Sequence, residues 1–178
     1  PRLIYCSISG YGQDGPYSQM VGHDINYISF AGALGLIGEK DRRPAIPYNI
    51  LADFAGGGMH AALAILAAII AREKTGQGQY LDIAMTDGVL YLLASAASEH
   101  FGQGFVPRRG ASRLNGGVPY YNVYRTRDGK WLSIGCIEPW FWENLCRALG
   151  CEELIPFEFD ETKHPEVFRT LRRIFRTR

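Results

Sequence analysis

Cysteine is scarce in the 178-residue sequence, and its four cysteines lack the paired spacing of a zinc or iron–sulfur site. They stand at positions 6, 136, 146 and 151. Thiols this sparse, with no C-x-x-C pair, are typical of reduced residues in a cytosol-like compartment, where they pack as small core side chains. We therefore predict reduced thiols and no metal site.

A strong excess of charge is also missing, as is an apolar run long enough to cross a bilayer. The formal net charge of +1 gives no reason to expect nucleic acid as a partner. The longest apolar run, AALAILAAIIA at residues 61–71, is shorter than the roughly 20 residues of a membrane-spanning helix. With 47% apolar and 21% charged residues, the composition is that of a soluble globular protein. We expect a buried helix here and no membrane span.

Both ends of the sequence lack the usual signals. No Met begins it, and FRTLRRIFRTR at the other end stops within a helical pattern that has no cap. We expect a piece of a longer protein. Because targeting signals lie at chain ends, the compartment stays open: cytoplasmic for a bacterial protein, mitochondrial or peroxisomal for a eukaryotic one.

The first part of the chain alternates between strand and helix patterns. Residues 2–9 and 80–85 are β-rich, and residues 22–38 have helical spacing. Residues 53–73 predict a helix that is apolar on nearly all sides and therefore buried. A further helix is predicted to run to about residue 101, with Thr86 or Asp87 as its N-cap.

From residue 102 the character of the sequence changes. Residues 102–118 are rich in Gly, Arg and Pro without periodicity, which favours an exposed linker. YYNVYRT and WLSIGCI then flank RDGK, which predicts a β-hairpin with Asp128-Gly129 at the turn. One helix should begin near Pro139 and stop at Gly150, and another should begin near Pro165. This second part is predicted to be a compact α+β lobe.

Asp53 lies shortly before three consecutive glycines at the predicted start of a helix. Backbone N–H groups and the helix dipole favour a carboxylate there, so Asp53 is either a simple N-cap or a functional acid. Each glycine lowers helix stability by about 0.5–1 kcal/mol relative to alanine, which suggests that something needs the room. No Gly-Lys-Ser/Thr follows, so the glycines do not form a phosphate-binding loop.

The remaining polar candidates are the histidines and one acid. His23 stands beside Asp24, and a histidine alone is more often structural than catalytic. His60 is expected to pack within its apolar helix, whereas His100 and His164 lie near helix ends. Glu138 follows a predicted strand and precedes a helix, so it is either an acid that faces a cleft or a partner of the helix dipole. Taken singly, none of these residues decides the function.

The stretches SGYGQDGPY, GHDINY, ADFAGGGMHAALAILAAI, TGQGQYLDIAM and GGVPYYNVYRTRDGKWLSIGCIEPWFW occur in this order. Together they resemble the class III CoA-transferase (CaiB/BaiF) family, and most closely its alpha-methylacyl-CoA racemase branch. The resemblance covers almost the whole chain.

The resemblance implies an α/β fold class. A Rossmann-like large domain is joined by a linker to a small α+β domain, and two subunits interlock as a homodimer. Here residues 1–85 would be the later part of the large domain, 86–117 the linker, and 118–178 the start of the small domain. The N-terminal region that forms much of the CoA nucleotide pocket in the family would lie outside this chain.

The resemblance also implies the chemistry. The aspartate before the glycine-rich helix, Asp53, is a nucleophile in the transferases and one of two bases in the racemases. The histidine of the G-H-D-x-N-Y motif, His23, is the other base, and Glu138 from the small domain orients it. Transferases typically lack this histidine, so its presence favours a racemase of 2-methyl-branched acyl-CoA thioesters.

Further residues are implied to bind the thioester. Gly22, Asp24 and Tyr27 are expected to contact it, and backbone N–H groups at Gly56 and Gly57 to stabilise the enolate oxygen. No cofactor is expected, because CoA is part of the substrate. Two alternatives stay open: a CoA-transferase with Asp53 as nucleophile, and an inactive piece that serves only in dimerisation.

Overall fold

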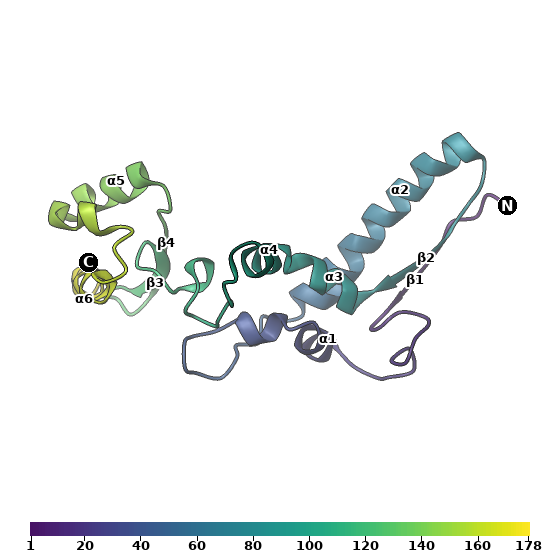
Figure 1. The fold of residues 1–178 in the computed structure, drawn as a ribbon, viewed down its shortest axis with the longest axis horizontal. Coiled ribbons are helices and arrows are strands. Elements are labelled where there is room, and N and C mark those ends of the chain that lie inside the picture. The colour runs from purple at the N-terminus through teal and green to yellow at the C-terminus, as the bar shows by residue number, and fades with distance from the viewer. The chain divides into compact units, whose positions relative to one another are not determined.

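The computed structural model describes residues 1–178, which form two compact units. The first unit comprises residues 1–37 and 43–107, and the second comprises residues 38–42 and 108–178. Figure 1 labels their helices and strands. Each unit has its own cluster of buried apolar side chains.

The first unit contains one pair of parallel strands, which are far apart in the sequence. Strand β1 (Tyr5–Ser9) pairs with β2 (Tyr80–Ala84) in a register that places Tyr5 opposite Tyr80. These two tyrosine rings stack with centroids 5.6 Å apart. Parallel strands need a crossover connection, and helix α2 (His60–Thr75), which precedes β2 and contacts both strands, supplies the last part of it (Figure 1).

The glycine-rich helix begins earlier than predicted. It starts at Ile50 as the π-helical segment η2 (Ile50–Met59) and continues directly into α2, so that Asp53 is its fourth residue and not its N-cap. The N-cap position is held by Asn49. The prediction that Asp53 marks the start of the helix was therefore wrong.

The prediction that this helix is buried was also wrong for the chain described. Leu63, Leu66 and Ile70 on α2 are 64%, 57% and 62% exposed, and His60, which was expected to pack within the helix, is exposed as well. The continuous helix Ile50–Thr75 has 26 residues, so by length and composition it could cross a membrane. Core helices of soluble proteins pass the same test, which makes it weak support for a membrane span.

Four shorter helical elements complete the first unit: α1 (Asp24–Phe30), η1 (Ala33–Leu36), α3 (Met85–Leu92) and α4 (Ala94–Gln103). The core of the unit lies between α1, η2 and α3, where Tyr27, Ile28, Ala52 and Val89 are buried. Helix α3 begins at Met85 with Ala84 at the N-cap position, so the predicted N-cap at Thr86 or Asp87 was wrong. The Thr86 hydroxyl instead donates to the carbonyl oxygen of Gly10 at 2.8 Å.

The second unit confirms the predicted hairpin and helices. Strands β3 (Tyr121–Arg125) and β4 (Trp131–Gly135) are antiparallel, and Gly129 in their turn has φ = +82°. Helix α5 (Pro139–Leu149) ends at Gly150, whose φ of +70° suits a C-cap glycine. Helix α6 (His164–Phe175) follows, and two short 3₁₀ segments, η3 (Arg113–Asn115) and η4 (Glu152–Phe157), complete the unit.

A tightly packed core holds the second unit together. Its fully buried side chains include Trp142, Tyr124, Leu171 and Val167. The indole N–H of Trp142 donates to the carbonyl oxygen of Leu154 at 3.3 Å, which ties α5 to η4. The predicted linker 86–117 divides between the units at residues 107 and 108, and α3 packs on η2 within the first unit.

The predicted α/β class is confirmed as a mixture of helices and small sheets. The Rossmann-like parent domain, the domain bounds of the whole protein and the interlocked dimer stay predictions.

Candidate active site

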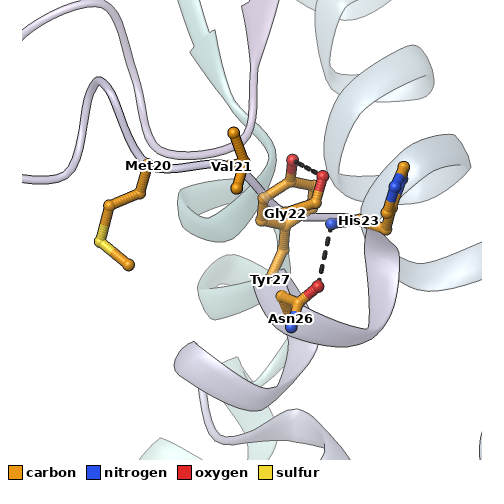
Figure 2. A pocket seen from close by; sticks show the side chains of 6 residues that line it. All are labelled: Met20, Val21, Gly22, His23, Asn26 and Tyr27. Atoms are coloured by element: carbon orange, nitrogen blue, oxygen red, sulfur yellow. Dashed lines mark hydrogen bonds between the residues drawn. The ribbon is translucent and has the colours of Figure 1, made fainter.

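His23 stands immediately before α1, on backbone that the helix start holds in place. Its φ of −132° is extended, as is usual for an N-cap position. The backbone N–H of His23 donates to Oδ1 of Asn26 at 3.1 Å (Figure 2). The carbonyl oxygen of His23 accepts the N–H of Asn26 at 2.8 Å. The side chain of His23 is exposed. A fixed backbone therefore presents an exposed imidazole to solvent or to a ligand.

Tyr27 and Gly22 form the floor of a pocket beside this histidine. The Tyr27 hydroxyl donates to the carbonyl oxygen of Gly22 at 2.6 Å, as Figure 2 shows. Burial raises the pKa of Tyr27, and the charges of Tyr11 and Asp53 raise it further, so the phenol stays a neutral donor. The pocket measures about 610 Å³ and is lined by Met20, Val21, Gly22, His23, Asn26 and Tyr27.

Asp24 is buried, with 5% of its surface exposed, and it bonds to the backbone of another helix. Its Oδ2 accepts the backbone N–H of Ala52 at 2.7 Å and that of Asp53 at 2.9 Å. The predicted role of Asp24 was a contact to the thioester. In the structure Asp24 contacts the first turn of η2, and the contact with the substrate stays a prediction.

Asp53 lies in that first turn, partly exposed. Its Oδ2 accepts a hydrogen bond from the side-chain amide of Asn49 at 3.0 Å. The sequence interpretation missed Asn49, although a spacing of four residues on one helix face is a signal that would find it. The structure thus brings His23, Asp24, Tyr27 and Asp53 into one unit, in which the side chain of Asp24 accepts the backbone N–H of Asp53.

Gly56 and Gly57 are buried against α3. A Cβ on Gly56 would come within 2.7 Å of the Met85 carbonyl oxygen, and one on Gly57 within 2.9 Å of the Met85 side chain. Their N–H groups lie beyond the first turn of the helix, where such groups are normally bonded within the helix. These glycines therefore permit close helix packing, and their predicted contact with the enolate stays a prediction.

Glu138 belongs to the second unit, where it holds the N-cap position of α5 and is exposed. Its carbonyl oxygen accepts the N–H groups of Phe141 at 2.9 Å and Trp142 at 3.2 Å. Its charge raises the pKa values of two neighbours, Glu158 and Cys136, for each of which burial is the larger cause. The predicted action of Glu138 on His23 stays a prediction.

No group of three or more His, Cys, Asp or Glu side chains lies close enough together to hold a metal ion. The four cysteines are free thiols, and burial raises the pKa of Cys146 to about 12. The thiol of Cys146 is therefore unreactive near neutral pH. The expectation that the protein needs no cofactor stays a prediction.

Comparison with known proteins places this geometry in a family. The family model for CoA-transferase family III matches residues 1–178. The human alpha-methylacyl-CoA racemase is 40% identical over 176 residues, which are 98% of this chain and 46% of that protein. The human succinyl-CoA:glutarate CoA-transferase is 32% identical over 168 residues, 94% of this chain and 37% of that protein.

A solved structure agrees with these sequence relatives. The CAIB/BAIF family protein from Brucella suis superposes with a TM-score of 0.78 at 29% identity, covering 100% of this chain and 48% of that one. The chain thus spans about half the length of the relatives that it matches. The match over every residue confirms the resemblance seen in the sequence: the chain belongs to CoA-transferase family III.

Proposed function

We propose that the protein of which this chain is part interconverts the two epimers of 2-methyl-branched acyl-CoA thioesters. The observation that carries the proposal is the joint presence of His23 and Asp53 in one unit, with Asp24 bonded to the backbone of Asp53. The identity to racemases from human and mouse, 40% and 39%, supports the same reaction class.

The chemistry requires one proton-transfer group on each face of the α-carbon. Neutral His23 takes the α-proton from one epimer, and the electrons of the broken C–H bond pass to the thioester oxygen as an enolate. Protonated Asp53 then gives its proton to the opposite face of the same carbon. The roles reverse for the other epimer. Histidine suits this exchange because an imidazole titrates near neutral pH.

The surroundings of the two groups support these roles. The extended backbone before α1 leaves the His23 ring exposed at the pocket, where a thioester can reach it. The Asn49 amide donates to Asp53 and leaves the second carboxyl oxygen of Asp53 for the proton. Glu138 is proposed to orient His23 and to stabilise its imidazolium form, as the family resemblance implies.

A second candidate is CoA transfer, because several relatives are transferases, among them the human succinyl-CoA:glutarate CoA-transferase. In that reaction the Asp53 carboxylate attacks the thioester carbonyl, the C–S bond breaks, and CoA leaves as a thiolate. The product is a mixed anhydride on Asp53. The CoA thiolate then attacks the Asp53 carbonyl, which releases the donor acid and leaves an aspartyl-CoA thioester, and a second carboxylic acid must accept CoA from it.

One incubation separates the two reactions. The complete gene product is given a single 2-methylacyl-CoA epimer in D2O without any acceptor acid, and both protein and thioester are weighed by mass spectrometry. The racemase proposal expects one deuterium at the α-carbon and no mass added to the protein. An acyl or CoA adduct on Asp53 without deuterium uptake would establish the transferase instead.

A further inference from the structure

Asp24 caps a helix to which it does not belong. The first N–H groups of a helix have no partner within it, and the N-cap side chain usually supplies one. In η2 the side chain of the N-cap residue Asn49 makes no such bond, and its amide N–H donates to Asp53. The partner comes from α1 instead: Oδ2 of Asp24, 28 residues from Ala52 and 29 from Asp53, accepts both N–H groups.

These two bonds are of a strong kind. A carboxylate that accepts backbone N–H groups at a helix N-terminus makes charge-assisted hydrogen bonds, and the helix dipole adds to them. Asp24 is 5% exposed, so little water competes for its oxygen. The first turn of η2 is therefore held firmly against the start of α1.

The bonded atoms lie next to the two proposed proton-transfer groups. Asp24 follows His23 directly in the chain, and one of the two donors is the backbone N–H of Asp53 itself. The path from the Cα of His23 to the Cα of Asp53 thus runs through one side chain and one hydrogen bond. Any change in that bond moves one group relative to the other.

We propose that Asp24 is a positioning residue that fixes the separation of His23 and Asp53 for proton transfer. This inference rests on the proposed function, and it gives Asp24 a role other than contact with the thioester. A displacement of about 1 Å between reacting groups can lower turnover by about 100-fold. Substrate binding depends on other contacts and is changed much less.

The geometry supplies a conservative variant and a matched control. In Asp24→Asn, the amide oxygen takes the place of Oδ2 and still accepts both N–H groups. The amide nitrogen takes the place of Oδ1, which is buried without a partner, so no existing bond is lost. Thr86→Val also removes a hydrogen bond in the first unit, from Thr86 to Gly10, and leaves both bonds of Asp24 to η2 in place.

The experiment measures kcat and KM for α-proton exchange in the complete gene product, together with amide hydrogen exchange at residues 52 and 53. For Asp24→Ala we expect kcat to fall by about 100-fold, KM to change less than about threefold, and both amides to exchange faster. Asp24→Asn should keep most of the turnover and of the amide protection. Thr86→Val should lower the melting temperature and leave kcat near the wild-type value.

Three results would overturn the inference. They are a normal kcat in Asp24→Ala, a KM that rises while kcat stays constant, and an equal loss of kcat in Thr86→Val. If the wild-type protein exchanges no α-proton at all, the proposed function fails. The amide exchange of Asp24→Ala then still shows whether the two bonds of Asp24 hold η2. Unchanged protection of the amides of residues 52 and 53 would refute that role of Asp24.

Discussion

Glu158 is a charged residue that the fold buries. The side chain is 4% exposed, and its Oε1 has no hydrogen-bond partner. Burial raises the pKa of Glu158, and the nearby charge of Glu138 raises it further. Water would solvate the charged form better than this site does, so the carboxyl of Glu158 holds its proton more tightly in the folded protein than in the unfolded chain.

Glu158→Gln should therefore make stability less dependent on pH. With a pKa raised on folding, wild-type Glu158 contributes its full stability below the unfolded pKa, and this contribution is lost as pH rises through the folded pKa. Gln does not titrate, so the variant lacks that loss. Its free energy of unfolding, relative to that of wild type, should therefore increase from about pH 4 upward. Urea unfolding at a series of pH values measures it.

The control for this series is Glu161→Gln. Glu161 is exposed, and its substitution removes the same negative charge close to Glu158 in the sequence. Its difference from wild type should vary little with pH. A constant difference for both variants would show that burial does not govern the titration of Glu158.

At the scale of single residues, the sequence identified the candidate catalytic residues better than the hydrogen bonds that hold them in place. His23, Asp53 and Glu138 lie in recognisable motifs, and such motifs are local. The bonds from Asp24 to residues 52 and 53 span 28 and 29 positions, and no local pattern marks them. For the same reason the sequence placed the start of the helix at Asp53, whereas a cap from α1 lets it begin at Ile50.

At the scale of elements, the contact between η2 and α3 depends on glycine. A Cβ on Gly88 of α3 would overlap the Gly56 carbonyl group, and one on Gly56 would come within 3.0 Å of the Val89 nitrogen. The two helices therefore meet backbone to backbone. This packing explains why the helix tolerates glycine at positions 56 and 57 in spite of its low propensity.

Gly88→Ala should destabilise the protein by about 1–3 kcal/mol, because the added methyl group overpacks a contact between backbones. The matched control is Gly58→Ala, since Gly58 is exposed and its nearest neighbour for a Cβ is the Asp53 carbonyl oxygen at 3.5 Å. There alanine should stabilise the helix by roughly 0.5–1 kcal/mol. Thermal unfolding of both variants measures whether each change raises or lowers stability. An equal loss of stability in Gly58→Ala and Gly88→Ala would contradict the packing argument.

The elements that the sequence predicted correctly have signals within their own few residues. Pro139 and Gly150 delimit α5, and Asp128-Gly129 forms the turn between β3 and β4. Elements whose ends depend on distant partners were misplaced. The hydroxyl of Thr86, for example, bonds Gly10 across the unit and does not cap α3.

On the scale of the whole molecule, the two units differ in how completely they bury their apolar side chains. The second unit encloses Trp142, Tyr124 and Leu171, whereas α2 in the first unit exposes much of its apolar surface. The sequence predicted two regions of different character, and it could not show which faces the chain covers by itself. Periodicity reports that a face is apolar and says nothing of what packs on it.

Leu171→Ala should destabilise the second unit by about 2–5 kcal/mol, because it leaves a cavity among fully buried neighbours. All three tryptophans, at positions 131, 140 and 142, belong to this unit, so their fluorescence reports its unfolding. Leu132→Ala is the control, since Leu132 is 45% exposed. A similar effect of the two changes would contradict the described core.

The most direct test of the central claim, that His23 and Asp53 serve opposite faces of one carbon, uses the two epimers separately. Initial deuterium uptake from D2O is measured for each 2-methylacyl-CoA epimer with wild type, His23→Ala and Asp53→Asn. The account predicts a crossed pattern: each variant loses exchange with the epimer whose α-proton its missing group removes, by about 100-fold or more, and keeps much of the other. Loss of the same epimer in both variants, or equal loss of both epimers with thioester binding intact, would contradict it.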